Sequence, residues 1–161
     1  MLPTAGQAHY LEFRTPMFCK LLWVSLCVST IIFASVFVIL ILGEFSYSGL
    51  AILGFTFLLV NSMLIWAIWA FGRYFIKASQ SNITFGYSHW NVSIDVETIA
   101  LIETIEIKWI KWGGVGWRVR SGKEIGYITG NGTGVRLCID GGKYYEFNCD
   151  NPQELIEGLK I

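Results

Sequence analysis

The chain has 161 residues, of which 53% are hydrophobic, and its twelve basic residues are balanced by twelve acidic ones. Modules that bind nucleic acid are normally strongly basic, so this balance argues against nucleic acid as a partner. The composition averages two unlike parts, because the sequence between Lys20 and Arg73 carries a single formal charge, Glu44.

The first expected element is an N-terminal lead, residues 1–20. Two apolar runs follow it, over Leu21–Leu42 and Gly49–Phe71, and the polar turn Gly43–Ser48 separates them. Each run of about 22 residues makes roughly 33 Å of helix, which matches the hydrocarbon core of a bilayer. Neither run has the polar face of a helix on a soluble protein. We therefore predict a two-span transmembrane hairpin over residues 21–72.

The flanks of the two runs predict their orientation. Arg14 and Lys20 precede the first run, and Arg73 and Lys77 follow the second. The positive-inside rule therefore places both termini in the cytoplasm. Within the second run Asn61 is a polar exception, and an intramembrane Asn commonly bonds a neighbouring helix. That helix is either the other half of the hairpin or a helix of a partner.

Residues 73–161 alternate between apolar and polar side chains, and Gly, Asn and Ser recur at short intervals, which predicts short antiparallel strands. The last hairpin can be worked out in detail. Its loop, Asp140–Gly142, suits a type I turn that closes on a left-handed Gly142. The resulting register places Arg136 opposite Glu146, a favourable cross-strand pair.

A short amphipathic helix is predicted after the last strand. Asn151 is expected as its N-cap, Pro152 at its first position and Glu154 at its third. The apolar stripe that would close the β domain consists of Leu155, Ile156 and Leu159.

This plan resembles the pleckstrin-homology-like (PH-like) domains of small bacterial membrane proteins. The similar features are a lead containing HYLEFRTP (His9–Pro16), two spans, a strand–turn–strand segment over Val92–Ile105, and a last hairpin and helix over Gly134–Leu159. The resemblance implies a bent antiparallel sheet or partly open barrel of about seven strands, capped by the C-terminal helix. It also implies a bacterial inner membrane, or its equivalent, as the location. Fold alone does not supply a function.

A basic and aromatic segment in the middle of the domain is the best candidate site. Lys111 and the pair Arg118 and Arg120 match the spacing with which lipid-binding PH domains grip an inositol phosphate, although here the spacing falls after several strands. Alternation along one strand is also ordinary for a solvated face. The alternative is attraction to anionic headgroups. The candidate lipid or partner contacts are Lys108, Trp109, Lys111, Trp112, Arg118 and Arg120.

Two arrangements of the tryptophans in this segment are open. Trp109 and Trp112 can form an exposed anchor for a membrane or a protein partner. Alternatively, they pack over the end of the sheet while Trp117 lies in the core.

No pattern in the sequence predicts catalysis or a bound cofactor. The four cysteines have no CxxC spacing and no accompanying histidine cluster, so we expect no metal site. No nucleophile or paired acid–base residues stand out. We expect a non-catalytic, membrane-anchored binding or assembly module whose partners are the lipid bilayer and either another protein or a second copy of the chain. The alternatives are a peripheral sensor of anionic lipid and an accessory subunit of a larger membrane complex.

Overall fold

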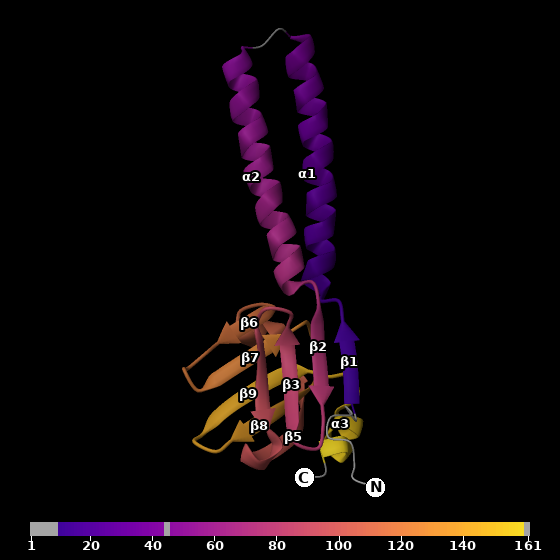
Figure 1. Ribbon diagram of the computed structural model, residues 1–161, viewed down its shortest axis with the longest axis vertical. Coiled ribbons are helices and arrows are strands. Elements are labelled where there is room, and N and C mark those ends of the chain that lie inside the picture. Colours follow the sequence, from indigo (N-terminus) through magenta and orange to yellow (C-terminus); the bar gives the residue numbers. More distant parts are fainter. Residues whose placement is uncertain (1–9, 44–45, 160–161) are drawn as a thin grey trace.

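The computed structural model describes residues 10–43 and 46–159. Two long helices, α1 (Met17–Leu42) and α2 (Tyr47–Phe71), stand side by side as a hairpin above a β-rich unit (Figure 1). Both helices are long and apolar enough to cross a membrane. The predicted helical hairpin is therefore confirmed, and each helix begins a few residues before the apolar run that predicted it.

The β-rich unit consists of two sheets. The first sheet contains, in spatial order, β1 (Tyr10–Arg14), β2 (Tyr74–Ala78), β3 (Asn82–Tyr87) and β4 (Asn91–Asp95). The second contains, in spatial order, β5 (Ile99–Ile107), β8 (Gly132–Ile139), β9 (Lys143–Asn148), β7 (Glu124–Ile128) and β6 (Gly116–Val119). Two short 3-10 segments, η1 (Val96–Thr98) and η2 (Trp109–Trp112), precede and follow β5.

The arrangement of the strands differs from the expected one. The described residues form nine strands in two sheets that do not close into a barrel, and β7 pairs with β9 in parallel. The expectation that all strands are antiparallel is therefore wrong at this pair. The tight turn between β8 and β9 makes those two strands neighbours, so β7 joins the other edge of β9 rather than pairing with the next strand in sequence. Alternation identifies strands but not their partners.

The strand before the first helix belongs to the β-rich unit. Residues 10–14, expected only as part of a lead, form β1 and pair antiparallel with β2, so that Arg14 faces Tyr74 and Tyr10 faces Ala78. Only two residues separate β1 from α1, and two separate α2 from β2. Because the hairpin brings the start of α1 beside the end of α2, the flanking strands meet. The helices thus continue directly into one β-ladder (Figure 1).

The core lies between the two sheets, and α3 (Pro152–Leu159) closes it. Phe85 of β3 stacks on Phe147 of β9 with a centroid distance of 4.0 Å, which joins the sheets. Leu155 and Leu159 of α3 are buried, as the predicted apolar stripe requires, whereas Ile156 is half-buried.

The last hairpin has the predicted register but a different turn. Arg136 stands opposite Glu146, and their side chains form an ion pair at 2.7 Å. Gly142 has a φ of 75°, as expected, but Gly141 also has a positive φ, 91°. A type I turn needs a negative φ at that position, so the type I prediction is wrong.

Candidate functional site

An aromatic cluster fixes the β-rich unit to the foot of the helical hairpin. Phe71, the last residue of α2, stacks on Trp90 of the loop between β3 and β4, and it meets Tyr87 edge to face. Phe18 of α1 also meets Tyr87, at 6.2 Å. The buried Tyr87 hydroxyl donates a hydrogen bond to the Ile128 carbonyl in the second sheet. Both helices and both sheets therefore share one packed joint.

The structure separates the residues of the predicted basic and aromatic site. Trp109 and Arg118 line one groove at the foot of α1. Lys108 lies 3.8 Å from Glu106, and Arg120 lies 3.8 Å from Glu124. These two ion pairs are exposed, so each contributes little to stability. Lys111 is exposed on η2. The six candidate contacts therefore do not form a single cluster.

Trp112 packs on the outer face of the second sheet. Its ring covers Gly126, where an added Cβ would lie within 2.7 Å of the indole. Its Nε1–H donates a hydrogen bond to Glu146, which also accepts from Arg136. Arg136 in turn donates to Glu103 at 3.1 Å. Trp112 is thus held by packing and by a hydrogen bond over the sheet, as in the second of the two arrangements considered for it.

Trp117 faces the core side of the second sheet but lies at its edge. Its partner across the ladder is Tyr127, whose own partner is the buried Phe147, and cross-strand partners share a face. The indole is nevertheless 43% exposed, and the next core-facing residue, Val119, is 51% exposed. Trp117 therefore faces the core, as expected, but its side chain is not fully buried.

The groove that contains Trp109 and Arg118 has a volume of about 640 Å³. Residues from β1, from the start of α1, from the segment after β5 and from the link between β7 and β8 meet there. Its charged lining residues are all cationic: Arg14, Lys20 and Arg118. Asn131 accepts a hydrogen bond from the Trp109 backbone N–H at 3.0 Å, which holds η2 against the β7–β8 link.

Sequence reasoning did not place Arg14 and Lys20 in a site, because it used them only to orient the hairpin. The available signal was the alternation of Tyr10–Arg14 directly before the first apolar run. A strand there must lie beside the strand that follows the second run, which brings its last residue toward the middle of the domain.

Asn61 joins the two helices of the hairpin. Its Oδ1 accepts a hydrogen bond from the Ser29 hydroxyl of α1 at 2.9 Å, and its Nδ2 donates to the Phe57 carbonyl one turn earlier. Phe33 stacks on Phe57 at 3.9 Å next to this bond. Hydrogen bonds of this kind between apolar helices contribute about 0.6–2 kcal/mol. Of the two arrangements considered for Asn61, the structure has the one within the chain.

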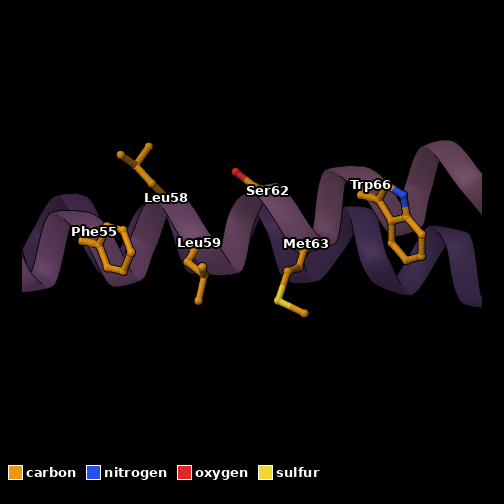
Figure 2. A pocket seen from close by; sticks show the side chains of 6 residues that line it. All are labelled: Phe55, Leu58, Leu59, Ser62, Met63 and Trp66. Carbon is orange, nitrogen blue, oxygen red and sulfur yellow. The ribbon is translucent and has the colours of Figure 1, made fainter.

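A second hollow lies on the outer surface of α2. Figure 2 shows its six lining side chains, which all come from this one helix: Phe55, Leu58, Leu59, Ser62, Met63 and Trp66. The Ser62 hydroxyl is the one polar side-chain group that is not part of a ring. A shallow apolar hollow on a helix of this length is the surface that lipid chains would cover if the helix spans a bilayer.

The buried tyrosines and the Cys149 thiol of the core are neutral near physiological pH. Burial raises the pKa of Tyr127 to about 12 and that of the Cys149 thiol to about 12. Burial also raises the pKa of Tyr74 well above its usual value. A nucleophile or general base needs a pKa near the working pH, and these shifts go in the opposite direction. Within residues 10–43 and 46–159 no group of three His, Cys, Asp or Glu side chains is arranged to hold a metal ion.

Comparison of the chain with protein-family models, curated proteins and solved structures gives no match. Two features of the described residues could contact a ligand or a partner: the cationic groove at the foot of α1 and the exposed edge strand β6.

Proposed function

We propose that this chain is a multi-pass membrane protein that acts as a non-catalytic binding module. It presents its β-rich unit at the cytosolic face of the membrane to a protein partner. The partner adds an extended segment to the free edge of β6. The bacterial inner membrane, or its equivalent, remains the proposed location, and a PH-like fold remains a prediction.

The anchor and its orientation are supported by the two apolar helices and their flanks. Basic residues lie at the start of α1 and after the end of α2, which is the distribution expected for a cytosolic side. The short link between the helices would then lie on the opposite side. Because α1 and α2 continue into paired strands, the β-rich unit would be held against the membrane instead of hanging on a flexible linker.

The observation that carries the proposal is the uncovered edge of the second sheet. Trp117 and Val119 face the core side of β6, yet about half of each side chain is exposed. In the part of the chain that the structure describes, β6 pairs with β7 alone. The backbone N–H of Arg120 donates to the backbone carbonyl of Glu124 in that ladder. Because backbone groups alternate in direction along a strand, the N–H groups of Trp117 and Val119 point to the open side.

β6 is four residues long and carries Arg118, and both features limit edge pairing, but Trp117 and Val119 stay exposed on its core-facing side. An exposed apolar edge can pair with another chain. A peptide that adds as a strand bonds the free N–H and C=O groups, and its alternate side chains cover the apolar residues beneath. Trp117 and Val119 would then become the buried centre of the interface.

The proposal is tested by placing a photo-crosslinking amino acid at Val119 in the full chain, in its native membrane. The matched control carries the same group at Ser93, an exposed residue of β4, which is an edge strand of the other sheet. We expect a discrete protein adduct from position 119 and not from position 93. No adduct, or the same adducts from both positions, would contradict the proposal.

A further inference from the structure

We propose that the groove at the foot of α1 binds the phosphate of an anionic lipid headgroup. The inference goes beyond a protein partner at β6 and shares with that function the membrane anchor and the strand β6, whose Arg118 lines the groove. It starts from the charge of the groove, since three cations line it and no carboxylate does.

The groove lies at the depth where headgroups would be. Phe18, Lys20 and Leu21, which line it, occupy the first turns of α1. One turn further along the hairpin Trp23 is exposed, and the exposed Trp66 and Trp69 lie near the end of α2. Exposed tryptophans of this kind settle at the boundary between the hydrocarbon core and the headgroups. The groove therefore opens directly beneath that boundary.

The three cations of the groove differ in whether a carboxylate already neutralises them. Arg14 is already held, since it pairs with Glu12 at 3.1 Å and with Asp150, and it donates to the Thr129 hydroxyl. Arg14 is thus held in place as a fixed part of the groove lining. Neither Lys20 nor Arg118 has a carboxylate within ion-pair distance among residues 10–43 and 46–159. Both are exposed and come from different elements, so their charges remain available to a phosphate.

The backbone at the groove leaves room for the Arg118 guanidinium. Gly114 has a φ of 131°, and an added Cβ there would lie 2.7 Å from Nη2 of Arg118. A side chain at position 114 would thus displace the guanidinium. Trp109, which is 42% exposed, forms another part of the lining, and Asn131 fixes its backbone. The result is a preformed cationic hollow that Trp109 and Phe18 also line.

A lipid fits this hollow better than an acidic segment of a protein. The lining combines cations with the apolar side chains of Phe18, Leu21 and Val115, and the helix that supplies two of these leads into the bilayer. A phospholipid offers a phosphate beside an acyl chain in the same arrangement. Surface cations attract anionic headgroups over distances of about one Debye length.

The experiment titrates the full-length protein in mild detergent with phosphatidylglycerol or phosphatidylcholine of identical acyl chains and counts bound lipid by native mass spectrometry. The double variant Lys20→Gln with Arg118→Gln removes both available cations. The control, Lys77→Gln with Lys143→Gln, removes the same charge from exposed residues that do not line the groove. Thermal unfolding of each variant verifies that it is folded.

We expect the wild type and the control to prefer phosphatidylglycerol. The double variant should lose about twenty-five-fold in affinity for it, because each near-surface cation contributes a factor of about five. Equal binding of the two lipids by the wild type, or an unchanged double variant, would overturn the inference. Displacement of phosphatidylglycerol by millimolar inorganic phosphate or by a hexaglutamate peptide would also overturn it. Crosslinking at Val119 does not depend on these outcomes, so the two proposals can fail separately.

Discussion

The ring of Phe71 lies nearly parallel to the indole of Trp90, with a centroid distance of 4.7 Å and an interplanar angle of 10°. Trp66 meets the same indole edge to face at 6.1 Å. Trp90 therefore links the last turns of α2 to the loop between β3 and β4. Through this contact the orientation of the β-rich unit relative to the hairpin is fixed by packing as well as by chain connection.

Trp90→Ala should loosen this joint. The half-buried indole contributes apolar burial and two aromatic contacts, so we expect the free energy of unfolding to fall by about 2–4 kcal/mol. Trypsin cleavage after the exposed Arg73 should become faster. Thermal unfolding and proteolysis of the full chain in detergent measure both effects. The matched control is Trp109→Ala, which removes a 42% exposed indole. Equal effects of the two substitutions would contradict the account of the joint.

Gly126→Ala should displace Trp112 from the outer face of the second sheet. The added Cβ would lie 2.7–2.9 Å from ring atoms, so the indole must shift and lose its hydrogen bond to Glu146. We expect a cost of about 1–3 kcal/mol and a change in tryptophan fluorescence.

Gly130→Ala is the control for this substitution, because nothing lies within 4 Å of a Cβ at that position. It should be close to neutral. The double variant Gly126→Ala with Trp112→Ala should lose less stability than the sum of the losses in the two single variants. The reason is that the added Cβ then meets no indole ring. Strict additivity would show that Trp112 and Gly126 do not interact.

Stability should fall at alkaline pH. Burial raises the pKa of the Cys149 thiol from about 9 to about 12, so the thiol ionises in the unfolded chain before it does so in the folded one. The stability that the buried neutral thiol contributes is fully present below about pH 9 and is lost as the pH rises from about 9 toward 12. Cys149→Ala should flatten the decline by up to about 1.4 kcal/mol per pH unit.

Chemical unfolding between pH 8 and pH 10.5 measures how steeply stability falls with pH. The cavity left by Cys149→Ala lowers stability equally at every pH, so it does not change this slope. Cys138→Ala, at a half-exposed thiol, is the control for the removal of a cysteine. A wild-type slope in Cys149→Ala would show that its ionisation is not coupled to folding. The buried tyrosines, whose pKa values are also raised, would then account for the alkaline decline.

The features that sequence reasoning predicted are those set by local patterns. The composition of two uncharged runs defines α1 and α2, and the three-residue loop after Ile139 defines the register of β8 and β9. The backbone dihedral angles within that loop could not be predicted from the sequence, because two consecutive glycines can adopt several turn types. The helix that follows Asn151 and ends at Leu159 is likewise predicted by its own capping residues and by the spacing of its apolar residues.

The features that sequence reasoning missed depend on contacts between distant segments. The pairing of β1 with β2 joins residues on opposite sides of the whole hairpin, and the parallel pairing of β7 with β9 is not specified by alternation. The groove is missed for the same reason. Trp109 and Arg118 were singled out, but Arg14 and Lys20 reach them only after β1 and α1 are placed.

The most direct test of the membrane-anchored account compares two single-cysteine variants of a cysteine-free chain, Ser46→Cys between the helices and Ser121→Cys between β6 and β7. Both positions are exposed, one in the link between the two helices and the other in the β-rich unit. In intact cells a membrane-impermeant maleimide should label position 46 at once and position 121 only after permeabilisation. Labelling of both positions from the same side would contradict a spanning hairpin with a cytosolic β-rich unit.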